Sequence, residues 1–163
     1  MNDLNNKQIT IFIATSITRK LGRPAEIARL RLLVDTIDGA ARANGAKTVC
    51  AFREEGWKGE DDPAVFVPRD FRWCVECDGA VVFPEDSYGV RVELGWLSAL
   101  QKPILRLHEG RIRHQTGLEK YLHRVCTIID RAITNPDDLA ETTSRFIESI
   151  RGGQSLRDFS QNG

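Results

Sequence analysis

Short apolar runs alternate with longer segments in which apolar residues recur every three or four positions along this chain of 163 residues. A short run of apolar and β-branched residues is typical of a buried strand, and the longer spacing is typical of an amphipathic helix. The pattern therefore predicts strands over residues 9–14, 47–52, 79–83, 103–107 and 125–129. It predicts helices over 24–41, within 64–77, from about 87 to about 100, near 118 and over 137–150.

Strands and helices alternate along the chain, an order typical of a parallel sheet covered by helices on both faces. We expect an α/β fold, namely a single flavodoxin-like or Rossmann-like domain over residues 1–151 with about five strands, followed by a flexible tail over 152–163. Ligands of such sheets bind at the carboxyl ends of the strands. The loops expected there are T-S-I-T-R-K, R-E-E-G-W and P-E-D-S-Y-G, after the first, second and third strands.

The charge balance argues against two classes of partner. The chain carries 23 basic and 23 acidic side chains, so it lacks the excess of positive charge that is typical of proteins that bind nucleic acid or an anionic membrane. No apolar run approaches the roughly 20 residues that span a bilayer. The first residues, M-N-D-L-N-N-K, contain no apolar region of a signal peptide, and we expect a cytoplasmic protein.

Four cysteines raise the question of a metal or redox site. Cys74 and Cys77 form a C-x-x-C, which occurs in redox pairs and as half of a zinc site. The chain has no second C-x-x-C and no H-x-x-x-H, and its three histidines are scattered. Buried reduced thiols are therefore the favoured interpretation, and we expect no metal.

The stretch D-S-Y-G-V-R-V-E-L-G-W places one carboxylate, Glu93, among apolar residues of a predicted helix. Ser87 is a suitable N-cap, and the free N–H groups at the start of a helix suit a phosphate. Gly89 would let an anion approach the backbone closely. Glu93 follows Ser87 by six residues, roughly 9 Å along a helix and about the reach from a nucleotide's phosphate to its sugar carbon. The competing interpretation is that Glu93 lies on a solvated helix face.

The signatures G-x-G-x-x-G, G-x-x-x-x-G-K-[ST] and G-x-S-x-G do not occur in the chain. The combination S-x-G-x-x-x-E-L-G, preceded by C-D-G-A-V-V-F-P and followed by A-L-Q-K-P-I-L, instead resembles the nucleoside 2-deoxyribosyltransferase superfamily. A serine six residues before the glutamate is similar to its nucleoside 5′-monophosphate N-glycoside hydrolase branch. A D-x-x-W-x-x-x-x-D pattern from Asp70 to Asp78 also matches, and the likeness covers about residues 9–107.

The resemblance implies a role for each matched residue. Glu93 would attack C1′ of the sugar and form a covalent glycosyl-enzyme, and Asp70 would supply or relay the proton that the departing base needs. Ser87 and Gly89 would bind the phosphate. Other substrate-binding residues are expected nearby: Phe12, Ser16, Ile17 and Arg19 on the phosphate and sugar side, and Glu54, Glu55 and Trp57 over the base. No metal or organic cofactor is implied.

Two further stretches resemble the cytidine monophosphate hydrolases of peptidyl-nucleoside antibiotic pathways. A-F-R-E-E-G-W-K-G is similar to their A-H-R-R-E-x-W-G, and Phe12 stands where deoxynucleotide hydrolases carry a tyrosine. A phenyl ring leaves room for the 2′-hydroxyl of ribose. The turn T-S-I-T-R departs from the family, because Thr15 replaces a glycine and Thr18 an arginine, for which Arg19 is the nearest substitute. The expected substrate is a pyrimidine ribonucleotide such as CMP or a 5-substituted CMP.

Several alternatives stay open at the level of the sequence. The protein would otherwise be a 2′-deoxynucleoside 5′-monophosphate hydrolase, or a deoxyribosyltransferase, although Ser87 stands where the transferases carry an aspartate. A nucleotide-sensing module without catalysis is the alternative of another class. Asp70 could instead cap or pair on a helix face, and Trp57 could anchor a dimer.

Assembly and supporting residues follow from the same resemblance. Members of the superfamily are homo-oligomers, commonly dimers, so we expect a homodimer in which the neighbour's segment 114–121 lies near the site. Asp78, at the junction of a helix and a strand, is expected to be structural. Trp73 and Trp96 are expected in the core.

Overall fold

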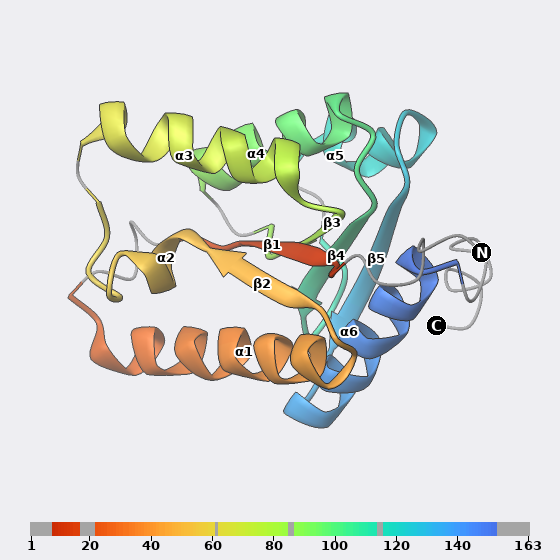
Figure 1. Ribbon diagram of the computed structural model, residues 1–163, viewed down its shortest axis with the longest axis horizontal. Helices are drawn as coiled ribbons and strands as arrows, with labels where there is room; N and C mark the ends of the chain where they lie inside the picture. Colours follow the sequence, from red (N-terminus) through yellow and green to blue (C-terminus); the bar gives the residue numbers. More distant parts are fainter. Residues whose placement is uncertain (1–7, 17–21, 61, 85–86, 114–115, 153–163) are drawn as a thin grey trace.

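The computed structural model describes residues 8–16, 22–60, 62–84, 87–113 and 116–152. Within these residues, five strands form one parallel sheet in the order β2-β1-β3-β4-β5 (Figure 1). The strands are β1 Thr10–Ala14, β2 Lys47–Cys50, β3 Gly79–Val82, β4 Ile104–Glu109 and β5 Ile128–Ile133. The predicted α/β fold with a parallel sheet is therefore confirmed.

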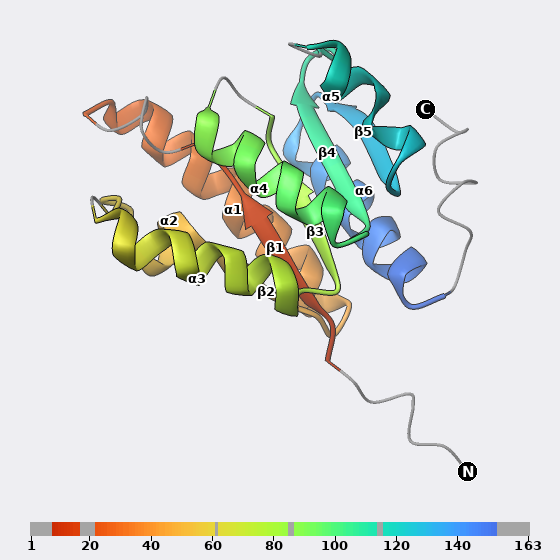
Figure 2. The same ribbon diagram turned by 90° about the horizontal axis from the view of Figure 1, so that it is seen from above.

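Helices cover both faces of the sheet, as expected. The helices on one face are α1 Pro24–Ala43 and α6 Pro136–Ile150, and those on the other are α3 Pro63–Glu76, α4 Tyr88–Ala99 and α5 Gly117–Tyr121 (Figure 1). α3 and α4 lie over the part of the sheet around β1 and β3, and α5 lies beside β4 and β5 (Figure 2). Two short elements complete the described part, α2 Ala51–Glu54 and the 3₁₀ turn η1 Leu122–Arg124.

The side chains of each strand alternate between two core layers. In β1, Ile11 and Ile13 belong to the layer beneath α1 and α6, and Phe12 and Ala14 belong to the layer beneath α3 and α4. All four are buried, which explains why this strand is apolar at consecutive positions. Full burial of a large apolar side chain contributes about 1.5–3 kcal/mol, so both faces of the central strands stabilise the sheet.

The second strand is shorter than the sequence predicts. A strand was expected over 47–52, but β2 ends at Cys50 and Ala51 begins α2. Phe52 of this single turn packs into the core layer beneath α1. An apolar side chain that faces the core suits a strand and a helical turn equally, so the pattern did not separate the two.

The last strand is displaced along the chain. A strand was expected over 125–129, but β5 spans Ile128–Ile133, and Val125 is 61% exposed. β5 contains the charged residues Asp130 and Arg131, so no continuous apolar run marks it. The strand can include Asp130 because that carboxylate pairs with Arg106 of β4, a contact that the sequence pattern does not reveal.

Smaller predictions about single residues are confirmed in part. Asp78 is structural, because its Oδ2 accepts a hydrogen bond from the Thr10 backbone N–H at 2.9 Å and ties the end of α3 to the start of β1. All four cysteines are buried free thiols. Trp73 and Trp96, which were expected in the core, are only partly buried and pack against the layer beneath α3 and α4. No helix in the described ranges has the length and apolar character that crossing a membrane requires.

A buried ion pair joins β4 to β5. Arg106 is 1% exposed and donates through Nε and Nη2 to the carboxylate of Asp130, at 2.5 and 2.7 Å. Its Nη1 donates to the Glu119 carbonyl at 3.1 Å, which ties α5 to the sheet. Burial raises the pKa of Asp130, but hydrogen bonds from His108 and Arg106 outweigh burial and hold that pKa well below its usual range.

Asp130→Asn is expected to destabilise the fold by about 3–5 kcal/mol, because the buried Arg106 guanidinium loses its counter-charge. Asp35→Asn, on the exposed side of α1, is the matched control and should change the free energy of unfolding by less than about 0.5 kcal/mol. Urea unfolding at pH 7 measures both variants.

The advantage of wild type over Asp130→Asn should also depend on pH. The folded-state pKa of Asp130 is depressed, so its contribution is complete above the unfolded value of about 3.9 and is lost as the pH falls through the folded value. Equal stability of the variant and wild type at pH 7 would contradict this account of the ion pair.

Candidate active site

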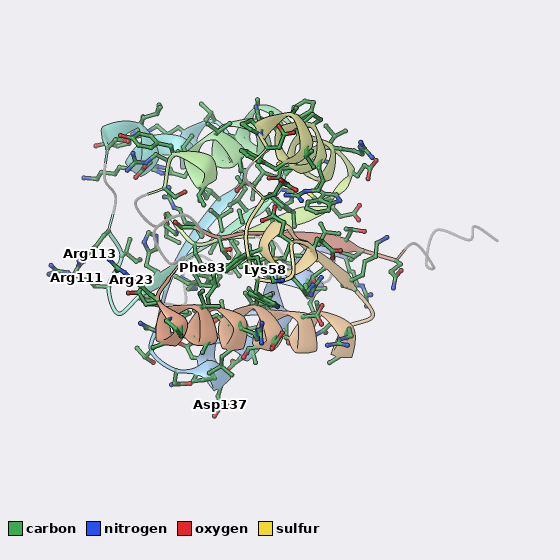
Figure 3. The ribbon with its side chains drawn as sticks, turned by 90° about the vertical axis from the view of Figure 1, so that its left-hand side faces the viewer. Arg23, Lys58, Phe83, Arg111, Arg113 and Asp137 are labelled. Carbon is green, nitrogen blue, oxygen red and sulfur yellow. The ribbon has the colours of Figure 1, made fainter. Side chains whose placement is uncertain are left out.

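The carboxyl ends of the five described strands meet at one edge of the sheet, because the strands are parallel. In the order β2-β1-β3, the chain passes from β1 to one side and returns to β3 on the other, so a topological switch point lies between β1 and β3. Figure 3 looks onto this edge, with Phe83, the residue after β3, near the centre between α1 and α4. Ser16 follows β1 and Ser87 follows β3, so both predicted loops flank the switch point.

The start of α4 is suited to an anion. Ser87 is its N-cap, as expected, but the serine side chain forms no capping hydrogen bond. The first N–H groups of a helix have no partner within the helix and are satisfied from outside it. Gly89 is exposed, and a Cβ at its position would lie 3.8 Å from Ser87 Oγ. That distance is an ordinary van der Waals contact, so the position has room for a side chain, and glycine there leaves the Ser87 hydroxyl and the first helix N–H groups uncovered by one.

Glu93 points from α4 into the protein and is 9% exposed. The alternative that it lies on a solvated helix face is therefore wrong. Its Oε2 has no hydrogen-bond partner among the residues that the structure describes. Burial, followed by the charge of Asp70, raises the pKa of Glu93 well above its usual range, and the charge of Arg69 opposes this shift. A buried carboxyl group with such a shift is typical of a functional site.

Arg69 joins two further carboxyl groups to this region. Its Nε donates to Asp70 Oδ1 at 2.9 Å, and its Nη2 donates to Glu55 Oε1. The guanidinium lies over Trp73, with Cζ 4.9 Å from the ring centroid. Asp70 is 7% exposed, and burial raises its pKa, as does the charge of Glu55, although the hydrogen bond from Arg69 lowers it. Asp70 is thus a buried residue that pairs with Arg69, not a residue of an exposed helix face.

Glu55, Asp70 and Glu93 form an acidic cluster. The raised pKa of Glu93 has the charges of Asp70 and Glu55 among its causes, and the raised pKa of Asp70 has the charge of Glu55 among its causes. Like charges in a desolvated site disfavour full ionisation, so such a cluster tends to retain a proton. A retained proton and a neighbouring carboxylate are what acid catalysis and nucleophilic attack require together.

Four predicted residues belong to β1 and the turn after it. Phe12 is buried in the same core layer as the inward face of α4, with its ring centroid 6.3 Å from that of Trp73. Ser16 is buried directly after β1. Ile17 and Arg19 lie outside the described residues. The structure therefore brings Phe12 to the layer that contains Glu93 and places Ser16 at the switch point.

Two residues predicted over the base lie away from the acidic cluster. The Glu54 side chain is 53% exposed and lies 3.9 Å from Arg53 Nε. Trp57 packs edge-to-face on Phe52, at 5.1 Å between ring centroids, in the core layer beneath α1. Arg31 of α1 lies over the indole, 4.9 Å from the centroid. Of the three residues predicted over the base, Glu55 is the one that reaches the cluster.

The sequence interpretation missed Arg69. The residue stands directly before Asp70, in a segment whose apolar spacing predicts a helix but gives no sign of a binding residue. The available signal was physical: acids predicted to be buried at one site require a cation to pair with them. Which residue supplies that cation depends on the approach of the end of α2 to α3, and this contact cannot be derived from the sequence pattern.

The predicted homodimer segment is described in part, since residues 114 and 115 lie outside the described ranges. α5 exposes Leu118 and Tyr121, and α3 and α4 expose further large apolar side chains on the same side of the sheet (Figure 1). The homodimer stays a prediction. Among the described residues, no group of three or more His, Cys, Asp or Glu is placed to hold a metal ion.

Comparisons with known proteins show the fold. No model of a known protein family matches the chain. No curated protein matches it. The solved structures that it resembles include BlsM, at TM-score 0.67 and 24% identity over 94% of this chain and 94% of that chain. They also include the CMP N-glycosidase BcmB of Clostridium botulinum, at TM-score 0.65 and 19% identity over 84% of this chain and 98% of that chain.

A 2-deoxyribosyltransferase from Bacillus psychrosaccharolyticus is a third similar structure, at TM-score 0.52 and 14% identity over 80% of this chain and 90% of that chain. These identities are low, so the likeness establishes a common fold and does not by itself transfer an activity. It agrees with the fold of the superfamily that the sequence motifs resemble.

Glu93→Gln is expected to stabilise the protein at pH 7 and above. The folded-state pKa of Glu93 is raised, so its contribution to stability is complete below its unfolded pKa and is lost as the pH rises through the folded value. A neutral amide avoids that loss, and each kcal/mol recovered raises Tm by about 2–4 °C.

Thermal melts of the Glu93→Gln protein and wild type between pH 4 and pH 8 measure this effect. Glu141→Gln, on the exposed side of α6, is the control and should leave the pH dependence unchanged. A difference in Tm between Glu93→Gln and wild type that does not grow with pH would show that Glu93 carries no cost of ionisation.

Proposed function

We propose that this protein belongs to the nucleotide branch of the nucleoside 2-deoxyribosyltransferase superfamily and hydrolyses the N-glycosidic bond of a nucleoside 5′-monophosphate. One observation carries the proposal: Glu93 is buried with an oxygen that has no partner among the described residues, and it follows Ser87, at the start of α4, by six residues. The carboxyl group suits a glycosidic carbon, and the helix start suits a phosphate.

The preferred substrate of this proposal is a pyrimidine ribonucleotide such as CMP or a 5-substituted CMP. Phe12 presents a phenyl ring without a hydroxyl in the core layer beneath α4, which supports a ribose over a deoxyribose. The common fold with a protein named CMP N-glycosidase supports a reaction at the same kind of bond. The products are a free base and ribose 5-phosphate.

In the first step of the proposed mechanism, a Glu93 carboxylate oxygen forms a bond to C1′ while the bond from C1′ to the base nitrogen breaks. The base leaves with the electron pair of that bond and takes a proton from the Asp70 carboxyl group, which becomes a carboxylate. The raised pKa of Asp70 supports this role, because the group retains a proton at a higher pH than an exposed aspartate. The pKa of Glu93 is raised as well, so the reactive form is the one in which Asp70 holds the proton and Glu93 is a carboxylate. The product of the step is a glycosyl ester of Glu93.

In the second step, water attacks C1′ and the ester bond to Glu93 breaks. Asp70, now a carboxylate, accepts the proton that the water loses, so the protein returns to its starting state. Two displacements at C1′ retain the configuration of the sugar, as in retaining glycosidases. The chemistry uses side chains that the structure places in the acidic cluster.

The phosphate anchors the substrate at a distance from the reacting carbon. Ser87, Gly89 and the first N–H groups of α4 lie roughly one to two turns before Glu93 on the same helix, and a rigid helix fixes the distance between them. Binding energy from the phosphate can then position C1′ against the carboxylate. The proposal therefore assigns the start of α4 to the phosphate of the substrate and Glu93, further along the same helix, to C1′ of its sugar.

Incubation with CMP, UMP, AMP, GMP and their deoxy forms, followed by chromatography for free base, tests the reaction. Wild type is expected to release base and sugar 5-phosphate from at least one nucleotide, and Glu93→Ala is expected to lose at least about a thousandfold in rate. Full hydrolysis by Glu93→Ala would sink the mechanism. Base exchange that requires a second base indicates a transferase, and binding without turnover indicates a sensor.

Ser87→Ala is expected to raise KM for the nucleotide by about tenfold or more, because a hydrogen bond to a charged phosphate is lost. The rate with the corresponding nucleoside should stay the same, since it has no phosphate to bind. Ser98→Ala is the control on the same helix, because Ser98 Oγ donates to the Leu94 carbonyl at 2.7 Å and lies far from the start of α4. Equal effects of Ser87→Ala on nucleotide and nucleoside would contradict a phosphate site there.

A further inference from the structure

Glu55 belongs to the acidic cluster, and one of its two carboxylate oxygens is available to accept a hydrogen bond from a ligand. It caps the end of α2, and its side chain is 7% exposed. Its Oε1 accepts a hydrogen bond from Arg69, and its buried Oε2 has no hydrogen-bond partner in the described part of the chain. A buried acceptor without a partner is costly unless a ligand supplies a donor.

Arg69 holds Glu55 and Asp70 side by side. The two carboxyl groups bind different nitrogens, Nη2 and Nε, of one planar guanidinium. Trp73 lies against that guanidinium, at 4.9 Å, and limits its rotation. The two carboxyl groups therefore present a fixed pair of polar groups, one directly after α2 and one from α3, near Glu93.

We propose that Glu55, held beside Asp70 by Arg69, determines which base is accepted by receiving a hydrogen bond from an exocyclic amine of the base. The inference rests on the proposed nucleotide hydrolase and adds a residue that sets its specificity. Asp70 is the neighbouring donor, and it contacts the ring nitrogen next to that amine.

Glu55 and Asp70 together match a base that has a hydrogen-bond donor next to an acceptor in one order, and they do not match a base with the reverse order. A carboxylate only accepts hydrogen bonds, whereas a protonated carboxyl group donates one. Cytosine carries an amine donor at N4 next to an acceptor at N3, which complements an accepting Glu55 and a donating Asp70. Uracil carries an acceptor at O4 next to the N3–H donor, so both contacts would be mismatched.

The same logic defines a chemical class of base. Adenine presents an amine beside a ring acceptor, as cytosine does, whereas guanine presents a carbonyl beside an N–H donor at the corresponding edge. The raised pKa of Asp70 is consistent with a donor at that position. Glu55 therefore selects 6-amino or 4-amino bases over their carbonyl counterparts.

The ratio of kcat/KM for CMP to that for UMP tests the proposal. Glu55→Gln is expected to lower this ratio by on the order of 10-fold to 100-fold, because the amide NH₂ can donate to O4 of uracil and no longer has two accepting oxygens. Glu76→Gln, at an exposed position on α3, is the matched control and should keep the wild-type ratio. An unchanged ratio in a folded Glu55→Gln protein overturns the proposal, even where both rates fall.

Arg69→Lys provides a second test of the proposal if a thermal melt shows that the Glu55→Gln protein is not folded. A lysine cannot hold the two carboxyl groups on separate nitrogens of one plane, so the CMP-to-UMP ratio should fall by at least about fivefold. A wild-type ratio in Arg69→Lys overturns the role of Arg69 in presenting Glu55.

A failure of the proposed hydrolase activity can be distinguished from a failure of the specificity role of Glu55. If wild type hydrolyses no nucleotide, calorimetric Kd values for CMP and UMP are compared between wild type and Glu55→Gln. Tighter binding of CMP than UMP that is lost in the variant supports the role of Glu55 without catalysis. Equal ratios in the two proteins, or no binding of either nucleotide, overturn it.

Discussion

The candidate site depends on the removal of carboxyl groups from water. Burial beneath α3 and α4 raises the pKa of Asp70 and that of Glu93, and Arg69 compensates only in part because its hydrogen bonds go to Asp70 and Glu55. In water such groups would ionise independently and have no reason to share a proton. The protein retains them at a cost to its own stability, and this conflict between folding and local chemistry is typical of functional sites.

The sheet topology explains how residues far apart in sequence reach this desolvated region. A parallel sheet ends all its strands at one edge, and the order β2-β1-β3 brings the segments after β2, β1 and β3 together there. α2 follows β2 without a connecting loop, so Glu55 lies close to the strand end, where α3 supplies Arg69 and Asp70. α4 then contributes its start and its inward face. The fold supplies the positions, and the side chains at those positions decide the chemistry.

Much of the fold and part of the geometry of the candidate site could be predicted from the sequence. Apolar runs predicted β1, β3 and β4, and the spacing from Ser87 to Glu93 is local, so a helix alone determines it. The position of β5 could not be predicted, because Asp130 is compatible with a strand only through its ion pair with Arg106 on β4. The pairing of Arg69 with Glu55 has the same origin, since it depends on contacts between elements that no periodicity encodes.

The ion pair between β4 and β5 also determines how the two strands align. Arg106 and Asp130 stand directly opposite each other in the sheet. A shift of β5 by one residue would turn Asp130 to the other face, and in one direction it would bring Arg131 opposite Arg106, a repulsion between like charges. A strand whose alignment is determined by charge has little freedom to slide along its neighbour. Because Arg106 also binds the Glu119 carbonyl, the same alignment determines where α5 begins its path over the sheet.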